Sequence, residues 1–328
     1  MDSIATRLSR PGFPNDPSAD GRAGGTLSQH VQRPPRPRWR RPVAEQVFSG
    51  KTVFVTGGSG GIGGACAEAL VREGAAALLM GRRLDALERT RDEILERVPG
   101  AHVAVHAGDG TKQGDVIAAL DAAFALQGRL DVVIPTVGGG AIRPLLMHDA
   151  ETFRADLDLN VMSVFLAVRY AAPLMVRSGG GSIVCISSDA AKLVFPWLPA
   201  YTTGKSGLEG FVRAAAEELA RFKIRVNAVR PGMTRTEATR ALFASPEIYQ
   251  RFAQEKPLGR LGEPQDIAAG VRYLAGPESS WVTGHSLAIE GGNELRKAPD
   301  LGPMAEQIYG KEAFTAVLEG RAPFDSAE

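Results

Sequence analysis

The chain has 328 residues, of which 44% are hydrophobic, and its formal net charge is +1. A chain of this length and apolar content can bury a sizeable core in one large domain or two small ones. A charge so close to zero gives no general reason to expect a nucleic acid as a partner. Cys66 and Cys185 both lie in apolar segments, so we interpret them as buried thiols of a cytoplasmic protein and not as a disulfide.

The sequence also argues against a metal site and a membrane span. His102 and His106 lie in an expected strand without an acidic or cysteine companion at metal-ligand spacing, so we expect a structural role for both. Arg169 interrupts the long apolar segment over residues 161–176, so no unbroken apolar run reaches spanning length. We therefore expect no metal and no membrane partner.

Residues 1–47 differ from the rest in composition. They hold seven of the 21 prolines and eight arginines against four acidic residues, so this segment carries +4 and the remainder −3. Because proline interrupts helices and sheets and apolar periodicity is lacking, we expect a disordered, solvated extension. A polybasic or polyproline contact segment is a second interpretation. A secretory signal is disfavoured, because Asp2 lies at the start and no apolar stretch follows.

A strand, a glycine-rich loop and a helix are predicted next. Residues 51–56 have the pattern of a buried strand, the loop follows it, and apolar residues at helical spacing come after the loop. This order is typical of a dinucleotide site, because bare backbone approaches a pyrophosphate closely and the helix N-terminus offers free N–H groups. A plain flexible loop is the alternative. The residues expected to bind the cofactor here are Gly57, Ser59, Gly60, Gly61, Ile62 and Gly63.

Two arginines follow the second predicted strand, residues 77–80. An acidic residue at this point would bind the ribose hydroxyls of NAD(H), but the chain has Gly81, Arg82 and Arg83 instead. Guanidinium groups pair with phosphate in a forked geometry, so we favour NADP(H) as the cofactor, with NAD(H) as the alternative. The two arginines are also compatible with the start of a solvated helix over residues 84–98.

The next two strand ends carry further candidate ligands of the cofactor. The strand over residues 103–106 leads to Asp109 and Gly110, which we expect near the adenine ring. The strand over residues 131–134 leads to a glycine-rich loop, in which Gly138 suits close packing against a ribose. A plain loop gives the same pattern.

Three segments outside these strands carry further expectations. A long helical pattern over residues 151–177 contains Asn160, which is either a satisfied core group or a functional residue, because asparagine is unfavourable inside a helix. Residues 236–258 are helical but loosely patterned, as in a mobile substrate lid. Residues 296–328 form a tail with one short helical pattern over residues 305–318.

The stretch from Ser182 to Lys205 carries the chemistry. An apolar strand over residues 183–186 ends before Ser188, and Tyr201 and Lys205 then share one face of a helix, four residues apart. A lysine ammonium favours the phenolate and lowers the pKa of the tyrosine from about 10. With Ser188 holding a substrate oxygen, this set can move a proton to or from an alcohol or a ketone. Without its context, the Tyr–Lys pair is equally compatible with an ordinary surface helix.

Seven predicted strands alternate with helices along the chain. This alternation predicts an α/β fold with a doubly wound parallel sheet, a Rossmann fold. Ligands of such sheets bind beyond the carboxyl ends of the strands, so the residues that follow strands are expected to form one composite site. We expect a disordered extension over residues 1–47, the Rossmann domain over 48–295, and a tail over 296–328 that adds to a subunit interface.

The order of these motifs resembles the short-chain dehydrogenase/reductase family over residues 48–295, and 3-oxoacyl reductases are a common type within it. The motifs are Thr56–Gly63 (T-G-x-x-x-G-x-G), Asn160, Ser188, Tyr201–Lys205 (Y-x-x-x-K) and Pro231–Gly232. The resemblance implies that Tyr201 is the general acid/base, that Lys205 lowers its pKa and binds the nicotinamide ribose, and that Ser188 holds the substrate carbonyl. It implies a water-mediated proton relay at Asn160. It also implies cofactor contacts at Gly138, Pro231, Gly232, Thr234 and Thr236.

One motif departs from the family. The family's N-N-A-G after the fourth strand is Pro135-Thr136-Val137-Gly138 here, so we expect different hydrogen-bond support of the sheet, with cofactor binding retained. The resemblance also implies a homotetramer or homodimer in which the helices over residues 151–177 and 201–222 pair across subunits.

We therefore expect an oxidoreductase that transfers a hydride between NADP(H) and a small-molecule ketone or secondary alcohol. The apolar residues 193–198 and the lid over 236–258 favour an apolar substrate such as a 3-oxoacyl thioester, a steroid or a terpenoid. An apolar loop is equally compatible with a core or subunit contact. The alternative function is a non-catalytic dinucleotide-binding regulator or scaffold, which the altered residues 135–137 and the basic extension would suit.

Overall fold

The computed structural model describes residues 46–297 and 300–323. The extension expected over residues 1–47 therefore lies outside the described residues, apart from its last two. Within the described ranges seven strands form one parallel sheet in the order β3-β2-β1-β4-β5-β6-β7, which confirms the predicted fold class. The strands are β1 (Thr52–Thr56), β2 (Ala76–Gly81), β3 (His102–Ala107), β4 (Val132–Pro135), β5 (Gly181–Ile186), β6 (Ile224–Pro231) and β7 (Ser286–Ile289).

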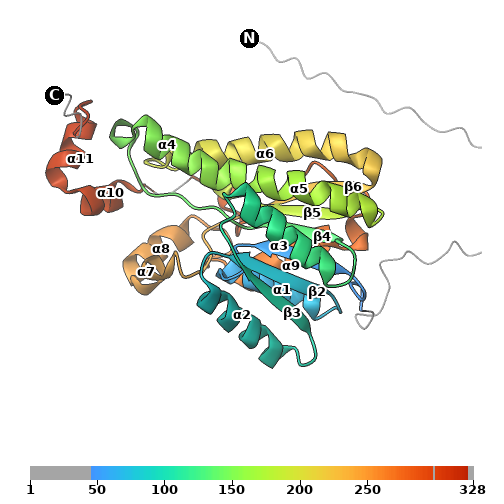
Figure 1. Cartoon of the computed structure of the whole chain (residues 1–328). Coiled ribbons are helices and arrows are strands. Elements are labelled where there is room, and N and C mark those ends of the chain that lie inside the picture. Colours follow the sequence, from blue (N-terminus) through green and yellow to red (C-terminus); the bar gives the residue numbers. More distant parts are fainter. Residues whose placement is uncertain (1–45, 298–299, 324–328) are drawn as a thin grey trace, which may run out of the picture. The chain divides into compact units, whose positions relative to one another are not determined.

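Helices cover both faces of the sheet (Figure 1). In the central strand β1, Val53 and Val55 join one core cluster and Phe54 joins the other, because successive side chains of a strand point to opposite faces. All three are fully buried, which explains the unbroken apolar run in the sequence. The first face is covered by α1 (Gly61–Val71), α2 (Leu84–Arg97) and α9 (Pro264–Ala275), and the second by α3 (Gln113–Ala125), α5 (Ser163–Arg177) and α6 (Pro199–Leu219).

The register of the sheet brings the carboxyl ends of the central strands together. Thr56, the last residue of β1, lies opposite Met80 of β2 and Pro135 of β4. The loops that follow these strands therefore emerge at one edge, where the sequence predicts the site. Short 3-10 turns lie in several connections, at Leu145–Met147, Asp189–Ala191, Ala220–Phe222, Pro277–Ser279 and Asn293–Leu295.

The predicted long helix over residues 151–177 is interrupted. It consists of α4 (Ala150–Leu157), a π-helical turn (Asp158–Met162) and α5. By length and composition the combined segment could cross a membrane. Its side chains Val164, Val168 and Met175 are instead buried in the core cluster that contains β4 and β5, as in the core helix of a globular domain.

Four short helices lie beyond the carboxyl edge of the sheet (Figure 1). They are α7 (Arg240–Ala244), α8 (Pro246–Gln254), α10 (Gly302–Tyr309) and α11 (Lys311–Leu318). The sequence predicted one helical pattern in the tail, and Gly310, with a φ of +85°, divides it into α10 and α11. A third apolar cluster joins Leu301, before α10, to Phe252 of α8 and to Phe195 in the loop before α6. The C-terminal tail is therefore part of the same edge as the expected site.

Candidate active site

The loop between β1 and α1 is shaped by glycine. Gly57 has a φ of +65°, a left-handed conformation that side chains disfavour. A Cβ atom at Gly58 would lie 2.6 Å from the Cβ of Leu79, and one at Gly63 would lie 2.5 Å from the carbonyl oxygen of Gly57. The loop therefore packs tightly against β2 and against the first turn of α1.

The N-terminus of α1 faces the same space. Its first N–H groups, on Gly61, Ile62 and Gly63, have no partner inside the helix, and the first turn contains no acidic residue. Free N–H groups at the positive end of a helix dipole suit the phosphates of a dinucleotide. The cradle therefore fits the expected cofactor, and Gly57, Ser59, Gly60, Gly61, Ile62 and Gly63 all line it.

The two arginines after β2 lie in different surroundings. Arg83 lines the cleft, but its guanidinium donates to the Glu237 carboxylate at 3.1 Å, and both side chains are more than half exposed. Arg82 is exposed and does not line the cleft. Its charge contributes to the lowered pKa of Asp109, which is held down chiefly by a hydrogen bond from the Thr111 N–H. Arg83 is thus already placed to bind a phosphate in the cleft. Arg82 would have to change its side-chain conformation to do so.

Two side chains support the loop after β4 in place of the expected family motif. The Oγ1 atom of Thr56 accepts from the Thr136 N–H at 3.1 Å. Asn160 accepts from the Gly139 N–H at 3.1 Å and donates to the Gly139 carbonyl at 2.7 Å. The first residues of the loop are therefore held by hydrogen bonds at Thr136 and Gly139, although only the glycine of the family motif is present.

Asn160 acts behind the cleft and does not line it. It lies in the π-helical turn, is fully buried, and also donates to the Asp156 carbonyl at 2.8 Å. A Cβ atom at Gly138 would lie 3.0 Å from Asn160 Oδ1 and 2.7 Å from Lys205 Nζ. Asn160 and Lys205 therefore leave no room for a side chain at position 138. The role of Asn160 in a proton relay stays a prediction.

Ser188, Tyr201 and Lys205 meet in the cleft, as the sequence predicted. Ser188 follows β5, whereas Tyr201 and Lys205 lie one turn apart in α6. Lys205 Nζ donates to the carbonyl of Ile186 at 2.9 Å and lies 5.8 Å from the centre of the Tyr201 ring. Ser188 Oγ accepts from the Ala190 N–H at 3.2 Å. A hydroxyl, a phenol and an ammonium thus converge beside the dinucleotide cradle.

The pKa values of this set differ from the expectation. Burial raises the pKa of Tyr201 to about 12, hydrogen bonding with Ser188 opposes the rise, and the charge of Asp189 adds to it. Burial also lowers the pKa of Lys205 to about 8. The expected lowering of the tyrosine pKa by Lys205 is therefore not present in this structure, because desolvation by burial is the largest effect on both groups.

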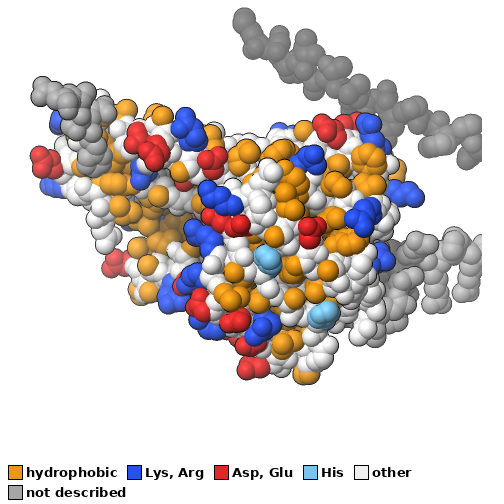
Figure 2. All heavy atoms as spheres, in the orientation of Figure 1, with side chains coloured by type: hydrophobic (Ala, Val, Ile, Leu, Met, Phe, Trp, Pro, Cys, Tyr) orange, Lys and Arg blue, Asp and Glu red, His pale blue; other side chains and the backbone are white. Residues whose placement is uncertain are grey.

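A single cleft of about 920 Å³ joins these parts. It runs from the glycine cradle past Ser188 and Tyr201 to α10, and Figure 2 shows hydrophobic side chains gathered in the hollow between α7–α8 and α10–α11. The expected cofactor residues Arg82, Asp109 and Gly110 do not line it. Those that do, besides the cradle, are Arg83, Gly138, Tyr201, Lys205, Pro231, Gly232, Thr234 and Thr236.

Sequence reasoning missed two groups of lining residues. The first consists of two buried charged residues, Asp189 after Ser188 and Lys256 after α8. The second comes from the C-terminal tail, namely Leu301, Met304, Ile308 and Tyr309. Leu301, Met304 and Ile308 are three and four positions apart, which is an apolar helical stripe that could have been read from the sequence.

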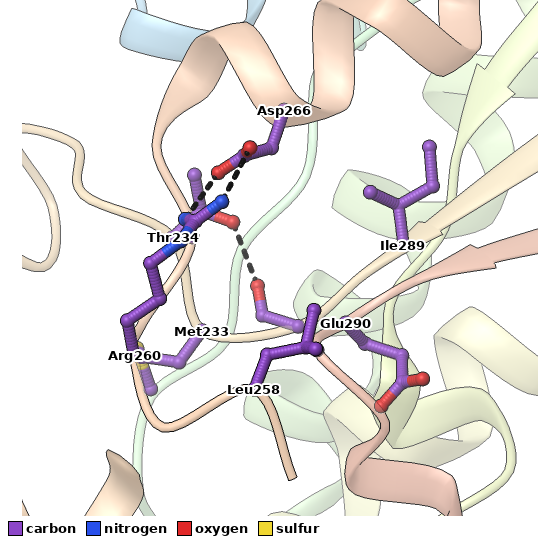
Figure 3. Close-up of a pocket in the computed structure, with 10 residues that line it drawn as sticks. Met233, Thr234, Leu258, Arg260, Asp266, Ile289 and Glu290 are labelled. Atoms are coloured by element: carbon purple, nitrogen blue, oxygen red, sulfur yellow. Dashed lines mark hydrogen bonds and ion pairs between the residues drawn. The ribbon is translucent and has the colours of Figure 1, made fainter. Parts of the chain in front are cut away.

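A second, much smaller pocket shares the segment after β6, residues 232–234, with the cleft (Figure 3). It has about 90 Å³, and its polar side chains are already paired, with Arg260 bound by both Asp266 oxygens at 2.6 and 2.8 Å. Thr234 Oγ1 donates to the Gly232 carbonyl at 2.8 Å. The paired side chains around this pocket therefore hold the segment after β6 in place, and that segment also lines the cleft. Over residues 46–297 and 300–323 no cluster of metal-ligand side chains occurs.

Comparison with known proteins agrees with this geometry. A family model described as enoyl-(acyl carrier protein) reductase matches residues 57–294. The chain is 35% identical over 245 residues to the 7alpha-hydroxysteroid dehydrogenase of Escherichia coli K12, which covers 75% of this chain and 94% of the relative.

Two solved structures extend the comparison. The structure of a short-chain type dehydrogenase/reductase from Mycobacterium ulcerans is similar with a TM-score of 0.77 and 37% identity, over 82% of this chain and 98% of that one. A 7 alpha-hydroxysteroid dehydrogenase complexed with NADH and 7-oxo glycochenodeoxycholic acid is similar with a TM-score of 0.72 and 33% identity, over 76% and 96%. The chain therefore belongs to the short-chain dehydrogenase/reductase family, whose members are NAD(P)(H)-dependent oxidoreductases of CH–OH and C=O groups.

Proposed function

We propose that this protein interconverts a ketone and a secondary alcohol of an apolar substrate, with NADP(H) as the favoured cofactor. The observation that carries the proposal is the convergence of Ser188, Tyr201 and Lys205 in one cleft with the glycine cradle. A dinucleotide bound in the cradle would extend along the carboxyl ends of the strands toward these three side chains. The substrate oxygen then has a proton source beside it.

The side chains have distinct tasks in this proposal. Tyr201 gives its hydroxyl proton to the substrate oxygen during reduction and takes a proton from the alcohol during oxidation. Ser188 holds the same oxygen by a hydrogen bond. Lys205, fixed by the Ile186 carbonyl and covered by Gly138, binds the cofactor ribose and offers positive charge to the developing phenolate. When bound, the nicotinamide supplies or accepts the hydride.

The preference for NADP(H) is supported by Arg83. It is the basic residue at the end of β2 that lines the cleft, and no acidic side chain follows β2 directly. Glu237 competes for its guanidinium, so a 2′-phosphate would have to displace an exposed ion pair, which is a small energetic demand. Titration of the protein with NADPH and NADH tests this point, and tighter NADH binding would contradict it.

An apolar substrate is supported by the walls of the cleft beyond Tyr201. This part comes from three separate segments of the chain, and it is lined by Phe195, Leu198, Phe252, Met304 and Ile308. Several similar proteins are named for steroid substrates. A steroid, a terpenoid or a 3-oxoacyl thioester presents the extended apolar surface that such walls can cover.

The deciding experiment replaces Tyr201 by phenylalanine. We expect loss of turnover by about a thousandfold or more, because the general acid is removed, with cofactor affinity nearly unchanged. Tyr273→Phe, at an exposed position of α9, is the matched control and is expected to keep full activity. Full activity of Tyr201→Phe would contradict the mechanism, and tight cofactor binding without turnover of any carbonyl in the wild type would point to a regulator.

We further propose a cytoplasmic homodimer or homotetramer. Both cysteines are free and buried, which suits a reducing compartment. Met162 and Phe165, on the π-helical turn and α5, are more than a third exposed, and Phe165 packs edge-on against Phe211 of α6. An apolar pair on two neighbouring helices suits contact with a second subunit. Sedimentation of Phe165→Glu against the wild type tests this contact.

A further inference from the structure

Ser188 has one hydroxyl proton, and Asp189 already accepts it in this structure. Its Oγ atom accepts from the Ala190 N–H at 3.2 Å and lies 3.2 Å from Asp189 Oδ1. A carboxylate has no proton of its own to give, so this second contact is a donation from Ser188 to Asp189. While it makes this bond, the serine presents only a lone pair to the cleft. A substrate ketone, which needs a donor, must compete with Asp189 for the same proton.

Asp189 is buried and has few hydrogen-bond partners besides Ser188. Its residue surface is 5% exposed, and its Oδ2 atom has no hydrogen-bond partner among the described residues. The charged groups that act on it are Lys256, from the segment between α8 and α9, and Glu290, which follows β7, with opposite effects. Its own charge acts in turn on Tyr201 of α6. Lys256 donates to Asn293 and makes no ion pair with Asp189 in the described part of the chain.

We propose that Asp189 is a positioning residue that competes with a bound ketone for the single proton of Ser188. The inference rests on the proposed function of Ser188 as a ligand of the substrate oxygen. Before its proton passes to Tyr201, an alcohol substrate is held in the other sense, because its hydroxyl can donate to the free lone pair of Ser188 while the serine still donates to Asp189. The ionised form of Asp189 therefore favours the bound alcohol over the bound ketone.

This arrangement makes ketone binding depend on pH. Burial raises the pKa of Asp189 to about 6, against the opposing effects of Lys256 and of the hydrogen bond from Ser188. Below this pH the carboxyl group is neutral and is a weaker acceptor, so Ser188 can turn its proton to the ketone. Above it the carboxylate holds the proton, and the ketone binds more weakly. By linkage, a bound ketone raises the pKa of Asp189 further.

The kinetic experiment uses 7-oxo glycochenodeoxycholic acid and the corresponding 7-hydroxy steroid as probes, with wild type, Asp189→Asn and Asp189→Ala, between pH 5 and 8. In the wild type we expect the KM of the ketone to rise severalfold, up to about tenfold, from pH 5 to 7.5, while the KM of the alcohol changes little over the same range. In both variants the rise should vanish, because neither alanine nor asparagine titrates in this range. At pH 7.5 the KM of the ketone in Asp189→Asn, whose amide oxygen is a weaker acceptor, should lie between the values of Asp189→Ala and the wild type. Equal losses for ketone and alcohol at every pH would show a merely structural role and overturn the proposal.

A second measurement does not depend on turnover. The carboxyl carbon of Asp189, assigned with Asp189→Asn, is titrated by NMR in wild type and in Ser188→Ala. Because Ser188 is the side-chain donor to this carboxylate, we expect its removal to raise the pKa of Asp189 further. An unchanged pKa would overturn the inference even in an active enzyme. Conversely, a raised pKa in a protein that turns over no carbonyl would contradict the proposed function and retain the Asp189–Ser188 bond.

Discussion

Two buried aspartates at opposite ends of the sheet show how differently its edges are built. Asp131, just before β4, accepts from Lys51 Nζ at 3.1 Å, from the Thr52 N–H at 3.0 Å, and from Arg129 at 2.8 and 2.6 Å. Asp189, beyond β5, has one side-chain hydrogen bond, and the partnerless Oδ2 described above.

Their pKa values shift in opposite directions. Burial alone would raise the pKa of Asp131, but hydrogen bonds from Arg129, Thr52 and Lys51 outweigh burial and lower it. Burial dominates at Asp189 and raises its pKa. The amino edge thus satisfies its buried charge and stabilises the fold, whereas the carboxyl edge keeps a poorly satisfied charge at the site, where such groups are typical of function.

The largest expected effect breaks the amino edge. Asp131→Asn should lower the free energy of unfolding by about 3 kcal/mol at pH 7, because Arg129 and Lys51 lose their counter-charge. The pKa of Asp131 is lowered by folding, so its contribution is present above the unfolded pKa of about 4 and is lost as the pH falls through the folded value. Urea unfolding at pH 7 and pH 3 measures this, with Asp121→Asn on the exposed face of α3 as the control. A loss no larger than that of the control would remove the contrast.

The second effect has the opposite sign. Asp189→Asn should raise the free energy of unfolding at pH 7.5 by about 1–2 kcal/mol, because a raised carboxyl pKa means that the folded state disfavours the charge. The gain should shrink as the pH falls from about 6 toward 4, where the unfolded carboxyl also becomes neutral. Loss of a counter-charge for Lys256 keeps the gain below the full shift. Thermal unfolding across this pH range is the measurement, and a gain that is independent of pH would show a different cause.

The smallest effect on stability lies at the rim of the carboxyl edge. Glu237→Gln should change the free energy of unfolding by less than about 0.5 kcal/mol, because its ion pair with Arg83 is exposed. It should nevertheless tighten NADPH by up to about fivefold, since Arg83 is released for the 2′-phosphate. NADPH and NADH titrations of this variant and of Glu217→Gln, an exposed control on α6, measure the difference. Equal tightening of both cofactors would remove Arg83 from the phosphate site.

Much of the fold and of the cofactor cradle is readable from the sequence because both depend on local patterns. The unbroken apolar run of β1 and the glycines after it report burial on two faces and close backbone approach, and the structure has both. The four-residue spacing of Tyr201 and Lys205 likewise places both on one face of α6. These features need no knowledge of distant segments.

The rest depends on contacts between segments far apart in the sequence. Asn160, which hydrogen-bonds to the loop after β4, lies in a π-helical turn, and helix propensities of single residues do not predict such a turn. Asp189 and Lys256 are 67 positions apart in the sequence, and folding makes both of them line the same cleft. The lowered tyrosine pKa expected from spacing alone was not found, because spacing does not contain the degree of burial.

The tail formed by α10 and α11 lies after the family match but contributes residues to the cleft. The family match ends at residue 294, yet Met304, Ile308 and Tyr309 line the far end of the cleft, and the Tyr309 hydroxyl donates to the Ile142 carbonyl at 2.8 Å. The residues proposed to transfer the proton therefore lie within that match, whereas part of the wall of the cleft comes from residues after it. Exchange of residues 300–323 for another sequence would therefore change which compounds the cleft accepts, while Ser188, Tyr201 and Lys205 lie outside the exchanged segment. This makes the tail a suitable segment for evolving or engineering new substrate selectivity.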